Sequence, residues 1–257
     1  MNQNAPCKLC GKNAKLLKKS HVIPDFMYRG IPDELNRMIV AELNSSNSKP
    51  KFQQSGYYDK YVLCSKCDNE VIGKLERYVA MLLFGGKSFK VPIFENAISP
   101  DGVKSVIIKD VNYRSLKLCI LSILWRAHIS NNKFFKKVDI GKNEKQIRKM
   151  LLTNDPKSEN DFKISIVAIR NSEGLIRMVI DPAVVKIGNG SVAIFFINGI
   201  FYFVDLLPSS DFALFQKHFL KEDGMYEMML LDGQTGKDFM YAFGLPRNVV
   251  DYYFLNE

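Results

Sequence analysis

Four of the five cysteines in this 257-residue chain form two Cys-x-x-Cys pairs, Cys7 with Cys10 and Cys64 with Cys67. The odd total and the paired spacing favour metal ligation over a disulfide framework. Four thiolates enclose a zinc ion tetrahedrally and leave no coordination position for a substrate, so such sites stabilise a fold. We therefore expect these cysteines to bind one structural Zn²⁺ ion. The fifth, Cys119, lies in an apolar helical pattern and is expected in the core.

The residues around each pair predict how this metal site is built. Gly11 follows the first pair and can adopt the left-handed conformation that turns backbone amides toward the sulfurs. The second pair stands directly before an expected helix at 68–84, whose N-terminal dipole favours thiolate over thiol. A polar turn at 44–50 predicts a hairpin over 37–54. A knuckle, a hairpin and two ligands at a helix start together predict a treble-clef module.

Beyond this module, hydrophobic periodicity changes from helical to strand-like spacing after a polar stretch at 153–161. Asn198-Gly199 is a strong signal for a two-residue hairpin turn. The expected elements are two strands within 88–109, helices at 112–128 and 143–152, strands at 162–170, 175–180, 192–198 and 200–206, and short helices at 210–220 and 237–243.

These elements predict an α+β protein whose N-terminal treble-clef zinc module is followed by helices and a mainly antiparallel β-sheet. We expect the zinc-binding module at 1–86 and a strand pair with helices at 87–160. The β-rich α+β region at 161–257 is expected to pack with the middle region as one domain.

The chain is basic, with a net charge of +9 and a pI near 9.2. Among residues 1–30, six lysines and arginines face a single acidic residue, Asp25. Taken alone, the charge slightly favours a solvated basic face. Because the basic residues overlap the metal-binding module, a polyanionic partner is the favoured interpretation, with DNA preferred. No run of about 18 apolar residues is present and the N-terminus lacks a signal-peptide core, so we expect a cytoplasmic protein without a membrane partner.

Between the cysteine pairs lies Ser20-His21-Val-Ile-Pro24, and Leu63 directly precedes Cys64. With the cysteines, this pattern resembles the zinc-containing HNH endonucleases. The resemblance implies a ββα-metal fold and a catalytic Mg²⁺ or Mn²⁺ ion distinct from the zinc. It also implies that His21 is the general base that activates water for phosphodiester hydrolysis. The motif covers residues 7 to about 80.

The sequence departs from the family at three positions of the implied catalytic site. Ser20 stands where the metal-binding acid is usual, Asp59 where the family has Asn, and Asp68 where it has a final His or Asn ligand. Serine is a weaker ligand than carboxylate for a hard cation, and Asp68 partly compensates. Glu70 and Glu76 are further oxygen donors on the same helix, or solvated charges.

Less specific similarity extends to bacterial HNH-like proteins, several of which resemble components of phage defence. It rests on the segments starting at His21, Gly56, Glu76 and Leu124, which read His-Val-Ile-Pro, Gly-Tyr-Tyr-Asp, Glu-Arg-Tyr and Leu-Trp-Arg-Ala. The leading hypothesis is a metal-dependent endonuclease. A non-catalytic nucleic-acid-binding module and a protein-interaction role, with a protein partner or a second copy of the chain, stay open.

Overall fold

The computed structural model describes residues 4–43, 51–85, 93–98, 102–208 and 218–254, and its main feature is a ten-stranded sheet. The strand order is β5-β4-β11-β12-β13-β9-β14-β8-β7, and β10 pairs with β9. Most neighbours are antiparallel, but β4 runs parallel to β11 and β14 runs parallel to β9. The strands are β4 (Met38–Ala41), β5 (Lys51–Gln53), β7 (Ile93–Ile98), β8 (Lys104–Lys109), β9 (Ile164–Asn171), β10 (Gly174–Leu175), β11 (Met178–Ile187), β12 (Gly190–Ile197), β13 (Ile200–Leu207) and β14 (Tyr226–Leu231).

Two local features set the register of the central strands. Asn198 and Gly199 have φ of 53° and 77°, the conformation of the two-residue turn that the sequence predicted between β12 and β13. In β11 the pairing with β12 shifts between Ile180 and Ala183. The buried Asp181 lies in this bulge, where its Oδ1 accepts a hydrogen bond from the backbone N–H of Leu43 at 2.6 Å. The bulge therefore fixes the end of the β4 segment to the sheet.

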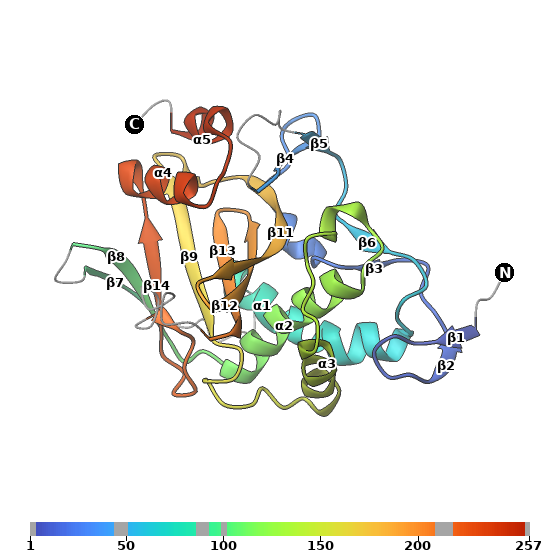
Figure 1. Cartoon of the computed structure of the whole chain (residues 1–257). Coiled ribbons are helices and arrows are strands. Elements are labelled where there is room, and N and C mark those ends of the chain that lie inside the picture. Colours follow the sequence, from blue (N-terminus) through green and yellow to red (C-terminus); the bar gives the residue numbers. More distant parts are fainter. Residues whose placement is uncertain (1–3, 44–50, 86–92, 99–101, 209–217, 255–257) are drawn as a thin grey trace.

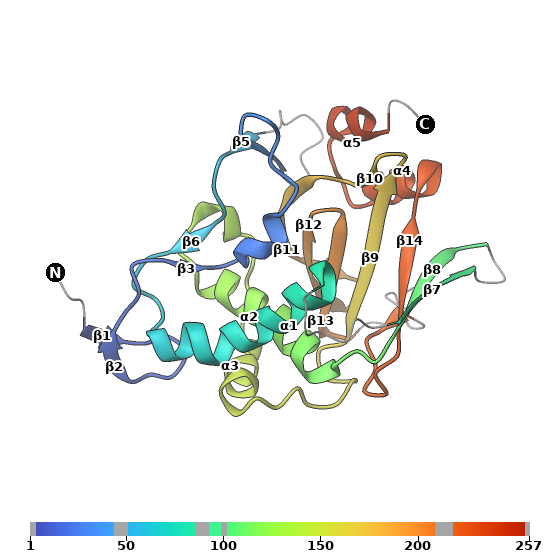
Figure 2. The ribbon, with the colours of Figure 1, turned by 180° about the vertical axis from the view of Figure 1, so that it is seen from behind.

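Helices cover both faces of the sheet, so that the molecule has three layers (Figures 1 and 2). The helices are α1 (Gly73–Phe84), α2 (Tyr113–Ile129), α3 (Asn143–Thr153), α4 (Gly233–Ala242) and α5 (Arg247–Tyr253). One hydrophobic core joins α1, α2 and α3 to residues such as Ile166 and Tyr202 on one sheet face. A second core joins α4 and α5 to alternate residues such as Val167 and Phe203 on the other face.

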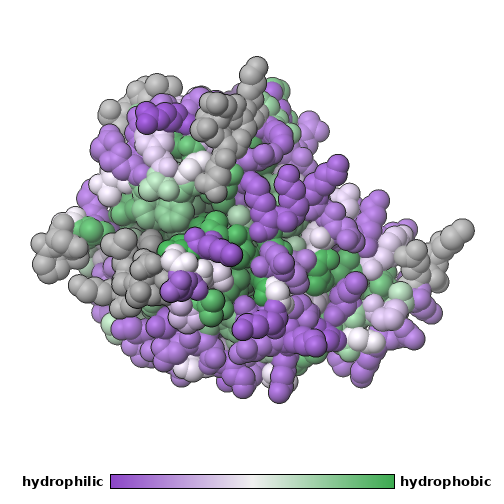
Figure 3. Space-filling view, in the orientation of Figure 1, coloured by the Kyte–Doolittle hydropathy of each residue, from purple (hydrophilic) through white to green (hydrophobic). Residues whose placement is uncertain are grey.

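The α2 helix is buried along almost its whole length. Asn112 caps its N-terminus, since its side chain accepts a hydrogen bond from the Ser115 N–H at 2.9 Å. Buried residues occupy every position from Leu116 to Ala127, including Lys117 and Arg126. In Figure 3 hydrophobic residues gather in the middle of the molecule, whereas hydrophilic residues dominate the surface below. A helix that is apolar on all sides needs neighbours on all sides, and the sheet, α1 and α3 provide them.

Two small sheets lie in the N-terminal part of the chain. β1 (Asn4–Pro6) pairs with β2 (Asn13–Lys15), and β3 (Ser20–His21) pairs with β6 (Tyr58–Asp59), both antiparallel. A turn of π-helix, η2 (Lys66–Ile72), leads directly into α1, and short 3₁₀ turns lie at η1 (Asp25–Tyr28) and η3 (Lys133–Phe135). Within the described residues, no helix has both the length and the apolar character required to cross a bilayer.

The α+β class and the mostly antiparallel sheet are as predicted, and the predicted hairpin over 37–54 is present as β4 and β5. Strand pairing crosses the predicted boundary at residue 86, because β4 extends the large sheet by pairing with β11. The expected helix at 210–220 lies largely outside the described residues. The sequence interpretation missed β14 and α5, and the expected strand at 175–180 begins at Met178 and continues to Ile187.

Candidate functional site

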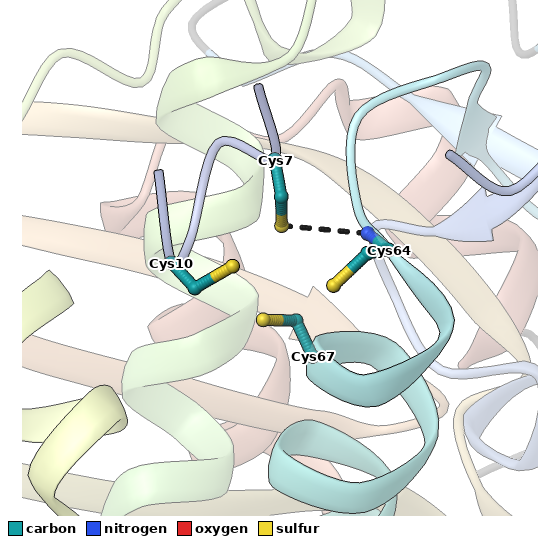
Figure 4. A group of neighbouring side chains, drawn as sticks. All are labelled: Cys7, Cys10, Cys64 and Cys67. Atoms are coloured by element: carbon teal, nitrogen blue, oxygen red, sulfur yellow. Dashed lines mark hydrogen bonds between the residues drawn. The ribbon is translucent and has the colours of Figure 1, made fainter. Parts of the chain in front are cut away.

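The side chains of the four paired cysteines point toward one another (Figure 4). Cys7 and Cys10 lie in the turn between β1 and β2, and Cys64 and Cys67 lie at the start of the helix formed by η2 and α1. Their sulfur atoms all lie within 4.8 Å of one another, and Cys7, Cys64 and Cys67 are buried. Zn–S bonds of about 2.3 Å place tetrahedral sulfurs roughly 3.8 Å apart. The four cysteines are therefore positioned to hold a metal ion after small side-chain movements.

The first pair has the backbone geometry of a metal-binding knuckle. Gly11 has a φ of +74°, the left-handed conformation that the sequence predicted for it. Its N–H donates to the Cys7 carbonyl at 2.8 Å, and the Cys7 N–H donates to the Lys12 carbonyl at 3.0 Å. Across the site, the Cys64 N–H donates to the Cys7 sulfur at 3.4 Å. This contact joins the two cysteine pairs directly.

Electrostatics also favour a cation among these sulfurs. Burial, and then the neighbouring thiols Cys10 and Cys64, raise the pKa of Cys67 well above its ordinary value. Buried thiolates repel one another in a low-dielectric site, whereas a divalent ion neutralises them and deprotonates its ligands. The donor set and its burial are those of a structural metal site, which is consistent with zinc.

The metal site is attached to the rest of the fold from two sides. The Lys8 N–H donates to the Val62 carbonyl at 3.0 Å, and Leu16 forms an isolated bridge with Cys64. On the other side, Nε of Arg148 in α3 donates to the Leu9 carbonyl at 2.6 Å. The knuckle is thus held between the segment that precedes η2 and the helix α3, so that metal binding would order contacts well beyond the cysteines.

Ser20 and Asp68 are brought together although they lie far apart in the sequence. Ser20 pairs with Asp59 across β3 and β6, and its hydroxyl donates a hydrogen bond to Oδ1 of Asp68. Asp68 directly follows Cys67, and Ser20 is buried. The two short strands and the following helix therefore meet at this contact.

The His21 side chain lies on the wall of an open cleft of about 400 Å³. Its ring is edge-on to Tyr58, with centroids 6.4 Å apart and an interplanar angle of 79°. Lys19 places its Nζ 4.5 Å above the Tyr58 ring, and exposed Arg29 and Asp25 also line the cleft. The cleft thus combines an imidazole with two cations and one carboxylate.

The position of His21 is fixed by Arg126 of α2, a residue that the sequence interpretation did not select as functional. Nη1 of the buried Arg126 donates to the His21 carbonyl at 2.6 Å, and its Nε donates to the Ser122 carbonyl at 3.2 Å. Nη2 lies 2.8 Å from Oε1 of Glu76, an ion pair without the angles of a hydrogen bond. Glu76 is therefore not a merely solvated charge. One signal for this ion pair was present in the sequence. Glu76 and Arg126 have opposite charges, and they lie in two of the segments on which the similarity to HNH-like proteins rests.

The Gly56 segment belongs to the same cluster. A Cβ atom at Gly56 would lie 2.6 Å from the Tyr28 ring, so only glycine fits at this contact. The Tyr57 N–H donates to the Tyr28 hydroxyl at 3.3 Å, and the Tyr57 ring stacks on Phe134 with a centroid distance of 3.8 Å. Burial raises the pKa of Tyr28 and raises that of Tyr57 to about 12, so both hydroxyls stay protonated. These tyrosines are packing residues.

The remaining predicted catalytic residues are near one another in the fold but do not form a ligand cluster. Among the described residues, the four cysteines are the one group of three or more His, Cys, Asp or Glu side chains placed to hold a metal ion. His21, Asp59 and Asp68 do not make such a group. Asp59 is half-buried opposite Ser20 in β6. The structure therefore supports the cysteine site, and beside it the Asp68 carboxylate and the Ser20 hydroxyl form a contact of two side chains.

Comparisons with known proteins add no relative. No family model, no curated protein and no solved structure matches the chain.

Proposed function

We propose that the cysteine site holds a structural Zn²⁺ ion in a treble-clef module, and that the chain is a metal-dependent nuclease with His21 as its general base. The observation that carries the proposal is the arrangement of β3, β6 and the helix after Cys64. This arrangement brings Ser20 against Asp68 and leaves the next residue, His21, on an open cationic cleft. A strand pair followed by a helix is the arrangement expected of a ββα-metal module, which supports the proposal.

The residues present are compatible with a catalytic divalent ion, although the number of protein ligands that they offer is close to the smallest found for such ions. Mg²⁺ keeps several water molecules and is often held by only one or two carboxylates together with substrate phosphates. Asp68 supplies the carboxylate and Ser20 a neutral oxygen, and these two side chains already touch. The chemistry that such an ion supplies is stabilisation of charge on the phosphate oxygens.

The chain's own residues account for the other steps. His21 accepts the proton of the attacking water, a role for which imidazole is suited near neutral pH. Arg126 holds the His21 backbone, and Lys19 and Arg29 attract phosphates to the cleft. Lysine and arginine contacts to a nucleic-acid backbone release counterions, so binding is expected to weaken steeply with salt. The resemblance to phage-defence proteins adds cleavage of invading DNA in the cytoplasm to this proposal.

The test is cleavage of plasmid DNA, and of single-stranded DNA and RNA, by purified protein with Mg²⁺ or Mn²⁺. We expect His21→Ala to lose activity by about 100-fold or more and Asp68→Asn to require more metal. His218→Ala is the matched control, because His218 lies away from the cleft and contacts the Glu227 carbonyl. Equal inactivity of the wild type and His21→Ala on every substrate would refute the proposal.

A non-catalytic nucleic-acid-binding module is the second candidate. It is favoured by the Ser20 hydroxyl bound to Asp68 and by the lack of a third ligand beside them in the described part of the chain. Under this alternative, salt-sensitive binding to DNA or RNA persists, whereas divalent metal neither binds near Asp68 nor promotes cleavage. Isothermal titration with Mn²⁺ on wild type and Asp68→Asn separates the two candidates, since only the nuclease predicts a difference.

A further inference from the structure

A second hollow, of about 660 Å³, lies between the β4–β5 hairpin and α5. Figures 1 and 2 show these elements side by side at one end of the molecule. Its walls come from the loop before β4, the turn after β9 and the last helix. We call this hollow the aromatic groove. It contains two large rings that are mainly exposed, Phe52 at 56% and Tyr252 at 62%.

The Phe52 ring is supported from one side by a fixed arginine. The guanidinium of Arg37 lies 4.7 Å from the ring centroid. Asp33 orients that guanidinium through hydrogen bonds of 3.0 Å from Nε and 2.8 Å from Nη2. The Arg37 charge is thereby partly neutralised while its planar group supports the ring. Phe52 is thus an exposed platform that is held in place.

On the opposite wall, Tyr252 is supported by its neighbour. Its ring is edge-on to Tyr253, with centroids 5.2 Å apart and an interplanar angle of 80°. The Tyr253 hydroxyl donates to the Arg177 carbonyl at 2.9 Å, and the Asn171 side chain donates to the Tyr253 carbonyl at 2.7 Å. Both exposed rings therefore belong to rigid surroundings, which reduces the entropy lost when a planar ligand stacks on them.

The aromatic groove lies next to the His21 cleft. Residues 29–39 separate the two hollows, and Pro32 lines both. Lys19 and Arg29 lie in the His21 cleft, whereas in the groove Arg37 and Arg177 are offset by Asp33 and Glu173. One ligand could therefore place phosphates in the cationic cleft and neutral planar groups in the balanced groove.

We infer that the aromatic groove binds a single-stranded segment of nucleic acid, with bases stacked on Phe52 and Tyr252. Bases stack on aromatic side chains without regard to sequence, while cationic residues follow the backbone. A duplex hides its base faces and cannot use these platforms. This inference rests on the proposed function, because the strand would continue into the His21 cleft. It makes a substrate with an unpaired segment the preferred one.

The experiment measures binding of a fluorescein-labelled 12-nucleotide DNA strand by anisotropy, using the His21→Ala protein without added Mg²⁺ or Mn²⁺. Phe52→Leu and Tyr252→Leu should each weaken binding by about 5-fold or more. Tyr252→Phe keeps the ring, and Leu35→Ala alters another exposed apolar residue, at 64%, so both should bind as the parent does. A duplex of the same sequence should bind more weakly than the strand and should not distinguish these variants.

Wild-type affinity in both leucine variants, or equal loss in Tyr252→Phe and Tyr252→Leu, would overturn the inference. The same outcome is expected if the groove instead binds an extended peptide along β5. The leucine substitutions would then leave oligonucleotide binding unchanged, and the inference would be overturned. Failure of the nuclease proposal looks different, since ring-dependent binding would persist while no variant or wild type cleaves. Conversely, if cleavage depends on His21 while binding does not depend on the two rings, only the inference about the aromatic groove is refuted.

Discussion

The contact between Arg126 and His21 makes a quantitative prediction about stability. The Arg126 side chain is 4% exposed and its partner Glu76 is 24% exposed. Removing one member of a buried ion pair costs about 3–5 kcal/mol, because the other charge stays desolvated. Arg126→Gln also removes the donor to the His21 carbonyl. Since Glu76 is partly solvated, we expect the lower end, a loss of about 3 kcal/mol in the free energy of unfolding.

Urea unfolding at neutral pH measures this loss, provided that the slope of the unfolding free energy against urea concentration is the same in the variant and the wild type. Arg77→Gln is the matched control, because Arg77 directly follows Glu76 in α1 and its side chain is exposed. It should stay within about 0.5 kcal/mol of the wild type. The double variant Arg126→Met with Glu76→Leu should recover part of the loss, since neither charge then stays buried alone. A loss below about 1 kcal/mol for Arg126→Gln would refute this account of the contact.

Three further predictions concern stability. Burial lowers the pKa of Lys117 from 10.5 to about 8. The unfolded chain therefore binds the Lys117 proton more tightly than the folded chain does. As a result, the contribution of Lys117 to the free energy of unfolding rises between pH 8 and 10.5. Lys117→Met should remove this rise, about 3 kcal/mol, in urea unfolding series at several pH values. Gly199→Ala would place a Cβ 2.7 Å from Leu175, whereas Gly141, which also has a positive φ, has open space at that position. In the same assay, Gly199→Ala should therefore lower the free energy of unfolding by about 1–3 kcal/mol more than Gly141→Ala does. Asp181→Ala leaves the Leu43 N–H unpaired and should cost about 1–3 kcal/mol; a thermal midpoint equal to that of the wild type would contradict this.

Sequence alone was sufficient where the signal is local. The cysteine pairs, the left-handed Gly11 and the Asn198-Gly199 turn each depend on a few adjacent residues. The structure reproduces the cysteine cluster and both backbone conformations. The long helices and central strands were predictable for the same reason, because periodicity over a dozen residues reports burial.

Contacts between distant segments could not be derived from local pattern. The parallel pairing of Ile39 with Met178 joins the N-terminal part of the chain to the main sheet, and no local signal marks it. β3 and β6 have two residues each, too few for any periodicity. Arg126 looks like a solvent-facing charge in its helix, yet it is buried because three segments converge on it. The motif named residues of the candidate site one by one, but it did not indicate the arginine that contacts His21.

Metal content per chain tests the central claim most directly. Elemental analysis by mass spectrometry should find one zinc ion per chain in the purified wild-type protein. Cys64→Ala should lose that ion and much of its folding cooperativity, whereas Cys119→Ala should keep it, because Cys119 is buried in the α2 core. A folded wild-type protein without metal, or a Cys64→Ala protein with undiminished zinc, would contradict the account.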